Sequence, residues 1–296
     1  MYGKILLVGT VSNVAKTLEK ELNSLRRALA IFNSVEVFLV ESDSSDNTVE
    51  VLKKIAHDYS DFTFISKNQL FEKYPNRIDR IAFCRNIYVN YIREHYENKK
   101  WNFIAVADLD GMNFKLRKNK IVTCFKSNLN WDGVMANQKY GYYDIYALRA
   151  EGWVEEDCFK ELESIKKLAD LNDKSKIMNK NLFKRFFYFD KFRKEIIYDR
   201  MRKLPVKSNW VKVLSAFGGF AIYKPRIFLV SDYSPLEGNQ VVSEHVNFHI
   251  RPETQNFNFY INPSLINSNF NEYNINKFKF IRLIREIKKI NHKKSE

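Results

Sequence analysis

Apolar runs alternate with helically spaced apolar residues along the first half of the chain. Short runs of the kind expected for strands buried on both faces occur at 4–8, 35–40, 62–65 and 102–107. Between them, apolar residues recur every three or four positions in three segments, 14–31, 46–58 and 78–96. This alternation is typical of βαβ units, so we expect a mostly parallel sheet with helices on its faces.

The second half of the chain has fewer strand-like runs, and strands are predicted there at 134–138 and 219–223. Residues 155–205 between them are charged and rich in aromatics, and no Gly- or Pro-rich linker brackets them. We therefore interpret this segment as a helical insertion rather than a separate domain. We expect one α/β domain over residues 1–270, which includes the insertion, followed by a basic amphipathic C-terminal tail at 271–296.

The charge of the chain is concentrated in these two additions. The 296 residues include 49 Lys and Arg against 35 Asp and Glu, a formal net charge of +14. Residues 160–203 hold 14 basic and 7 acidic side chains, and residues 272–296 hold 8 and 3. Such segments fit an anionic membrane surface or a nucleic acid. The apolar stripe of the tail fits a membrane interface, or packing onto its own domain.

Cysteine usage and hydropathy indicate the compartment. Cys84, Cys124 and Cys158 lie far apart, and none of them forms a CxxC pair or a metal-binding spacing with His. This argues against a disulfide framework and a structural zinc site, and it fits a reducing compartment. No apolar run reaches the roughly 20 residues that a spanning helix needs. We expect a cytoplasmic protein, either free or peripheral on the inner face of the cytoplasmic membrane.

Two acidic residues directly follow the buried strand at 102–107, in the order Asp108-Leu109-Asp110. In open α/β sheets, ligands bind outside the carboxyl ends of the strands. Two carboxylates there can hold one hard divalent cation, Mn²⁺ or Mg²⁺, which in turn binds a diphosphate. The tripeptide alone is also compatible with a solvated turn, so its place at a strand end favours the metal site.

Polar residues also follow the first two strands. Thr10 and Ser12 come after the first strand with Gly9, and the run Glu41-Ser-Asp43 comes after the second. Their oxygens can accept hydrogen bonds from a nucleoside, or cap the next helix, with Asp46 as the predicted N-cap. The first loop has neither G-x-G-x-x-G nor a Walker lysine, which excludes classical dinucleotide and P-loop sites.

Arg85 is the candidate diphosphate ligand in the helix at 78–96. Its fork of N–H donors suits a diphosphate, although an exposed helix arginine is an equal alternative. Two candidate groups come later, the pair Gly218-Gly219 and the pair Glu244-His245. The glycines permit a close backbone approach to a ligand, or simple core packing.

The order of these segments resembles that of GT-A glycosyltransferases. In more detail, the chain resembles the cryptococcal capsule-type α-1,3-mannosyltransferases of glycosyltransferase family 69 and their bacterial relatives. The likeness covers roughly residues 4–150 and 210–250, and Tyr146 stands where the family has Trp. It is carried by ESDSSDNT at 41–48, RN at 85–86, DLD at 108–110, YDIYALR at 143–149, AFGGFAIY at 216–223 and SEHV at 243–246.

The resemblance implies a GT-A-like, Rossmann-type fold and a role for each candidate residue. Asp108 and Asp110 would hold Mn²⁺ or Mg²⁺ on the diphosphate, with His245 as a further metal ligand. Glu244 and Asp144 would be catalytic, with Glu244 as a general base if the reaction inverts, whereas the named family implies retention. A Glu-His pair is also common on ordinary surfaces. The implied nucleotide-sugar ligands are Gly9, Thr10, Ser12, Glu41, Asp43, Arg85, Asp108, Arg149, Gly218 and Gly219.

The sequence therefore predicts a metal-dependent glycosyltransferase, specifically a hexosyltransferase. Its donor would be a GDP- or UDP-linked sugar, mannose by the resemblance, and its acceptor a cell-surface glycan or lipid-linked oligosaccharide of lipopolysaccharide or capsule. One alternative is a nucleotidyltransferase that makes a nucleotide sugar, although Gly9–Asn13 lacks the basic residue expected for it. Another is a nucleic-acid-binding protein, and only 184–189 resembles its signature, so we expect no nucleic-acid partner.

Overall fold

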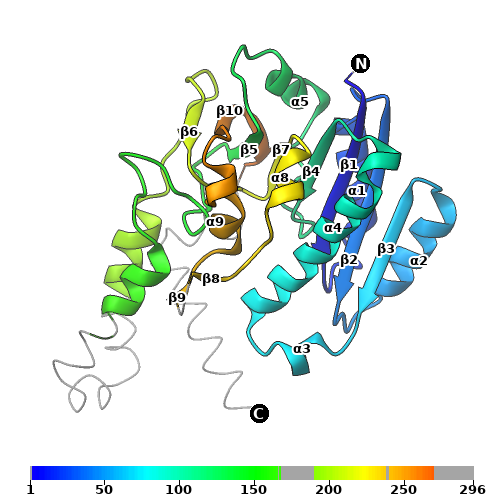
Figure 1. Cartoon of the computed structure of the whole chain (residues 1–296), viewed down its shortest axis with the longest axis horizontal. Coiled ribbons are helices and arrows are strands. Elements are labelled where there is room, and N and C mark those ends of the chain that lie inside the picture. Colours follow the sequence, from blue (N-terminus) through cyan, green and yellow to red (C-terminus); the bar gives the residue numbers. More distant parts are fainter. Residues whose placement is uncertain (1, 166, 168–189, 238–239, 270–296) are drawn as a thin grey trace.

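The computed structural model describes residues 2–165, 167, 190–237 and 240–269 (Figure 1). The predicted C-terminal tail and the central part of the predicted insertion lie outside these residues. In the described part of the chain, no helix combines the length and the apolar character that crossing a membrane requires.

One eight-stranded sheet forms the centre of the molecule. Its strands are β1 (Lys4–Val11), β2 (Ser34–Ser42), β3 (Phe62–Lys67), β4 (Phe103–Ala107), β5 (Gly133–Gln138), β6 (Val211–Val213), β7 (Phe220–Tyr223) and β10 (Phe259–Ser268). They lie in the order β3-β2-β1-β4-β7-β5-β10-β6. A separate short hairpin pairs β8 (Leu236–Glu237) with β9 (Gln240–Val241).

Strands β3, β2, β1 and β4 are parallel to one another, as the alternating pattern predicts. The second half is mixed, because β7 lies antiparallel between β4 and β5, and β6 lies antiparallel to β10. Strands β5 and β10 are parallel. The predicted fold class, a mostly parallel α/β sheet flanked by helices, is confirmed.

The helices cover both faces of the sheet. They are α1 (Leu18–Ala28), α2 (Thr48–Asp58), α3 (Leu70–Lys73), α4 (Arg77–Lys99), α5 (Lys118–Phe125), α8 (Arg226–Val230) and α9 (Glu244–His249), with a π-helix at Lys194–Tyr198 and a 3-10 turn at Pro252–Thr254. One apolar core packs β1 side chains such as Leu6 against α4, α8 and α9. The other packs alternate β1 side chains such as Leu7 against α1, α2 and α5.

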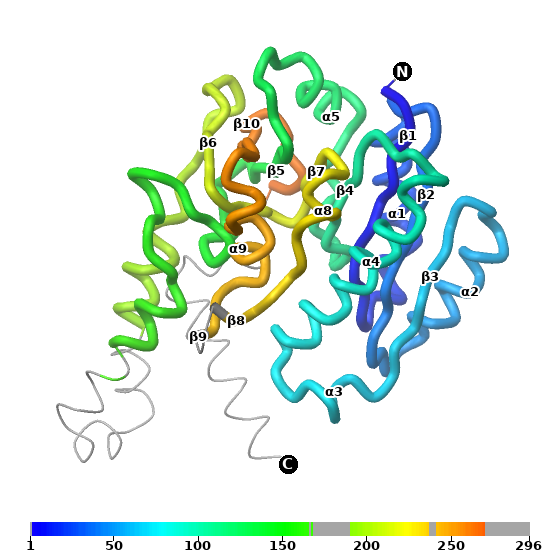
Figure 2. The backbone as a smooth tube through the Cα atoms, in the orientation of Figure 1, coloured from blue at the N-terminus to red at the C-terminus, as the bar shows by residue number. Residues whose placement is uncertain are grey.

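The two described parts of the predicted insertion lie side by side, although they are distant in sequence. Residues 158–165 are helical and pack beside residues 190–198 at one end of the molecule (Figure 2). Arg200 fastens the two parts through a bidentate ion pair with Glu161, at 2.6 and 2.7 Å. The Trp153 indole N–H donates to the carbonyl of Arg200 at 2.7 Å. These contacts fix the part of the insertion that lies next to the domain.

The turn into β7 requires glycine. Gly218 has a φ of +72°, and a Cβ at this position would lie 2.8 Å from the backbone oxygen of Ala136. Both the left-handed backbone and the contact with a fixed backbone atom oppose any side chain here. Gly152 also has a positive φ, of +65°, but a Cβ there would meet nothing within 4 Å.

We expect Gly218→Ala to lower the free energy of unfolding by about 3 kcal/mol, because strain and a clash act together. Gly152→Ala is the matched control, and it should lose only about 1 kcal/mol, from its backbone conformation alone. Urea denaturation of the two variants measures both losses. Equal losses would show that contact with Ala136 does not constrain this turn.

Candidate functional site

The carboxyl ends of β1, β2 and β4 open onto a cavity of about 860 Å³. Its walls come from the loops after these strands, from α4, from the start of α9 and from the insertion. The sequence-predicted residues that line it are Thr10, Ser12, Asp43, Arg85, Asp108, Asp110, Asp144, Glu244 and His245. The structure thus places residues predicted for catalysis, for nucleotide-sugar binding and for metal binding around one cavity.

The loops after β1 and β2 are tied to each other. The side-chain oxygen of Asn13 accepts hydrogen bonds from the backbone N–H groups of Ser45, at 2.8 Å, and Asp46, at 3.2 Å. Asp46 accepts from the N–H groups of Ala15 and Thr48, and the N-cap position of α2 is Asn47 rather than the predicted Asp46. Many polar groups of the second loop therefore shape the cavity rather than face a ligand.

Glu41 and Asp43 differ in position. Glu41 is fully buried and accepts hydrogen bonds from the backbone N–H of Ser44, at 2.9 Å, and from the hydroxyl of Ser66. It supports the loop and does not line the cavity. Asp43 does line it: one carboxylate oxygen accepts from the N–H of Leu70 at 3.1 Å, and the other is buried with no partner among the described residues. That oxygen is an acceptor whose hydrogen-bonding capacity is unused within the described residues.

Arg85 joins the two halves of the chain. Its guanidinium is buried and contacts Asp108, at the end of β4, at 3.1 Å and Glu244, at the start of α9, at 3.3 Å. It also lies over the rings of Phe217 and Tyr233, 5.2 and 5.4 Å from their centroids. The predicted diphosphate ligand is therefore committed to holding two carboxylates together.

The charges around Arg85 outweigh the effect of its burial. Burial alone would lower the pKa of Arg85, but Tyr88, Asp108 and Glu244 raise it well above its usual value. The side chain is thus a permanent cation. It offsets the repulsion that would otherwise separate Asp108 and Glu244.

Asp144 lines the cavity together with Asp108 and Glu244. We call the side of the cavity formed by these three carboxylates the reaction wall. Asp144 accepts hydrogen bonds from the backbone N–H groups of Gly218, at 3.0 Å, and Ala147, at 3.4 Å. Burial raises the pKa of Asp144 to about 6, and the nearby charges of Asp108 and Glu244 act in the same direction. The wall therefore carries more negative than positive charge, which favours binding of a cation.

The predicted glycines lie outside the cavity wall. A Cβ on Gly9 would lie 2.6 Å from the carbonyl oxygen of Ala107, so this glycine lets β1 and β4 approach each other. A Cβ on Gly219 would lie 2.7 Å from Met112. With Gly218 against Ala136, all three glycines permit packing within the protein rather than contact with a ligand.

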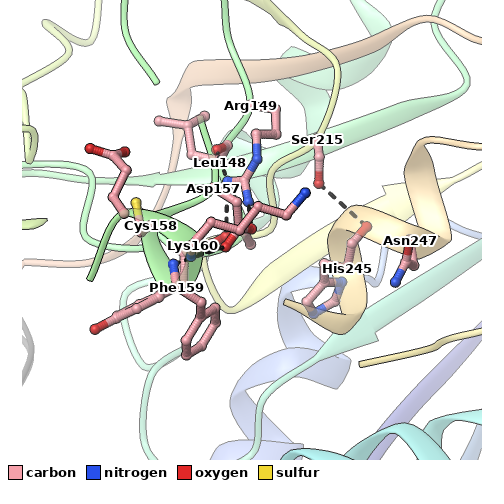
Figure 3. A network of polar contacts seen from close by, with 12 residues as sticks. Leu148, Arg149, Asp157, Cys158, Phe159, Lys160, Ser215, His245 and Asn247 are labelled. Carbon is pink, nitrogen blue, oxygen red and sulfur yellow. Dashed lines mark hydrogen bonds and ion pairs between the residues drawn. The ribbon is translucent and has the colours of Figure 1, made fainter. Parts of the chain in front are cut away.

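Arg149 also lies outside the cavity wall. Its guanidinium forms a buried ion pair with Asp157 and donates to the carbonyl of Leu148 (Figure 3). It also donates to the carbonyl of Tyr146. Asp157 in turn accepts from the backbone N–H groups of Phe159, at 2.8 Å, and Lys160, at 3.2 Å. These bonds cap the helical residues 158–165. Arg149 thus positions the start of the insertion.

His245 is buried beside Glu244 and stacks on Phe217 with ring centroids 4.0 Å apart. Burial lowers the pKa of His245 well below its usual value, as do Arg85 and His249. The imidazole is therefore neutral at pH 7, and neither ring nitrogen has a hydrogen-bond partner among the described residues. His249 is different, since Ser215 and Tyr223 both contact its ring nitrogens at 3.0 Å.

The predicted metal ligands do not form a complete site within the protein. Among the described residues, no group of three or more His, Cys, Asp or Glu side chains has the arrangement of a metal site. Asp108 and Asp110 both line the cavity, with Asp110 exposed. Two carboxylates of this kind fit a cation that takes its remaining ligands from water and substrate phosphate.

Glu21 is a functional candidate that the sequence analysis missed. It is fully buried, and its carboxylate accepts hydrogen bonds from the backbone N–H groups of Gly111, at 2.7 Å, and Asn113, at 2.8 Å. It therefore holds the loop that carries Asp110. Burial raises the pKa of Glu21 to about 7, and the charges of Asp110 and Asp108 add to the rise. The available signal was an acid between Leu18 and Leu22 on the apolar face of a helix.

Part of the chain matches a known protein family. Residues 8–98 match the model of Glycosyl transferase family 2, which is less than a third of the chain. The matched segment includes the loops after β1 and β2 and most of α4 with Arg85. For this segment, the match confirms the predicted glycosyltransferase class. No curated protein has significant sequence similarity to the chain.

Solved structures of glycosyltransferases match the chain at low similarity. Mannosyltransferase PcManGT from Pyrobaculum calidifontis, in complex with GDP-Man and Mn²⁺, is 10% identical with a TM-score of 0.42, over 87% of this chain and 56% of that one. S. aureus TarS 1–349 with UDP-GlcNAc is 14% identical with a TM-score of 0.42, over 93% and 61%. This chain thus spans little more than half of either structure, and TM-scores this low carry no inference about its activity.

Glu21 gives the folded protein a specific pH dependence. Because its pKa is about 7 when folded and 4.5 as a free side chain, the folded state binds more protons between these values. Its contribution to stability is therefore fully present below pH 4.5 and is lost as pH rises to 7. In the absence of divalent cations, we expect the wild type to lose about 3 kcal/mol relative to Glu21→Gln between pH 5 and 8. Urea unfolding at both pH values measures this, and a constant difference between the two proteins would refute it.

Proposed function

We propose that the protein is a metal-dependent glycosyltransferase, which moves a sugar from a nucleoside diphosphate sugar to a hydroxyl group of an acceptor. The observation that carries this proposal is the convergence of Asp108, Asp144 and Glu244 on one cavity. The loops after β1 and β2, which line the same cavity, belong to the segment that matches a glycosyltransferase family. A wall of this kind provides charge for a cation and a base for an acceptor.

The nucleoside would bind next to the loops after β1 and β2. Thr10, Ser12 and Asp43 line the cavity there, and the second carboxylate oxygen of Asp43 is a buried acceptor without a partner among the described residues. A ribose hydroxyl or a base N–H would supply the missing hydrogen bond, which removes the cost of burying that oxygen. Glu41 does not line the cavity and would contribute indirectly, because it fixes the loop through Ser44 and Ser66.

Asp108 and Asp110 would hold Mn²⁺ or Mg²⁺ together with oxygens of the diphosphate. When bound, the cation neutralises charge that develops on the departing diphosphate. Arg85 holds Asp108 in place, and Glu21 holds the backbone that follows Asp110. His245 offers a neutral ring nitrogen on the same wall, which is the protonation state that metal coordination requires.

Glu244 would accept the proton of the acceptor hydroxyl if the reaction inverts. Its side chain is mostly buried and lies 3.3 Å from Arg85, which holds the carboxylate in position on the cavity wall. Asp144, whose pKa is about 6, is a second proton acceptor on the same wall at neutral pH. From the sequence resemblance we propose mannose from GDP-mannose as the donor and a cell-surface glycan or lipid-linked oligosaccharide as the acceptor.

The test is release of nucleoside diphosphate from a panel of nucleotide sugars with Mn²⁺. We expect turnover with one donor, and a loss of about a hundredfold or more in kcat/KM on changing Asp110→Ala. Asp58→Ala is the matched control, because Asp58 ends α2 and does not line the cavity. It should leave turnover unchanged. An absence of turnover with every donor, or equal turnover in Asp110→Ala and wild type, would exclude the proposed function.

A further inference from the structure

We propose that the part of the cavity next to the insertion binds the acceptor, and that it selects a glycan carrying a carboxylate or phosphate. This inference rests on the proposed glycosyltransferase function. We call this part the aromatic lobe, and define it by the lining residues Tyr146, Phe159, Arg193, Tyr198 and Phe217.

The aromatic residues of the lobe suit a sugar ring. Tyr146 and Phe159 lie with ring centroids 4.7 Å apart, and both line the cavity. Aromatic faces pack well against the C–H groups of a pyranose, and aromatic side chains commonly line ligand cavities. Phe217 stacks on His245, so the lobe continues to the wall that carries Glu244. A sugar placed there would have a hydroxyl next to the proposed reaction centre.

The protein holds this aromatic wall in a fixed position. Phe159 lies in the first turn of the helical residues 158–165, which Asp157 caps and the buried Arg149 anchors. The Arg200–Glu161 ion pair then joins this turn to the part of the insertion that contains Arg193. A binding surface that is ordered before the ligand arrives costs less entropy on binding. The anchoring role of Arg149 thus has a functional consequence.

Arg193 supplies the charge selectivity. It is exposed, and it lines the cavity without an ion pair or hydrogen bond to any described residue. It also lies close enough to Tyr146 to lower the pKa of that hydroxyl against the larger effect of burial, which raises it to about 12. The other arginines on the cavity wall, Arg77, Arg80 and Arg85, all belong to α4. Arg193 is therefore the cation that the described part of the insertion contributes to this wall.

The distribution of charge would orient an acidic acceptor. Asp108, Asp144 and Glu244 repel an anion from the reaction wall, whereas Arg193 attracts it to the aromatic lobe. A neutral sugar would gain the ring contacts without this orientation. An acidic group on the acceptor would thus bind Arg193 while a hydroxyl of the same molecule faces Glu244.

The test measures binding of three oligosaccharide probes to the full chain by titration calorimetry with Mn²⁺ and nucleoside diphosphate. The probes are a hexuronate tetrasaccharide, its carboxyl-reduced neutral form and a phosphorylated oligosaccharide of similar length. We expect at least one acidic probe to bind about tenfold more tightly than the neutral one, and Arg193→Gln to abolish this preference. Comparison of the carboxylated and phosphorylated probes identifies which anion the lobe prefers.

Lys194→Gln is the matched control, because it removes one charge from the neighbouring position and Lys194 does not line the cavity. Lys194→Gln should keep the preference for acidic probes. Phe159→Ala should weaken the binding of both acidic and neutral probes. The inference is overturned if no acidic probe binds the wild type more tightly than the neutral probe, or if Arg193→Gln keeps the preference. Nucleoside diphosphate binding to each variant is measured separately. Its absence from the wild type would instead refute the proposed function.

Discussion

The buried guanidinium of Arg85 is the constraint on which the candidate site depends. It contacts Asp108 from the parallel half of the sheet and Glu244 from a helix more than a hundred residues later. Without a cation between them, these two carboxylates would repel each other. Because Phe217 and Tyr233 also pack on the guanidinium, the position of the reaction wall is coupled to the core beneath α9.

The buried contacts of Glu21 and of Arg149 also fix parts of the site, although neither residue lines the cavity. Glu21 holds the loop that carries Asp110, and Arg149 with Asp157 holds the first turn of the insertion. In each case a titratable side chain is removed from water and is compensated by several hydrogen bonds or an opposite charge. Such groups add little net stability, yet they fix the geometry of the loops that hold them.

The parallel half of the fold was predictable because its strands are continuous apolar runs at short intervals. Strand β10 was not, since Asn262, Pro263 and Asn267 interrupt its apolar residues. The sequence placed nine of the candidate residues on the cavity, but it could not separate ligand-facing polar groups from structural ones. Arg149 is an example. Its role is structural because it pairs with Asp157, and the sequence motif does not reveal that partner.

The most direct test of this arrangement is the free energy of unfolding of Arg85→Met, alone and combined with Asp108→Asn and Glu244→Gln. If Arg85 holds the two carboxylates together, the single variant should lose about 2–3 kcal/mol, because it leaves the partly buried Asp108 and Glu244 without a compensating charge. Neutralising both carboxylates in the triple variant should then recover most of the lost free energy of unfolding. A single variant as stable as the wild type, or a triple variant no more stable than the single one, would contradict the central role of Arg85.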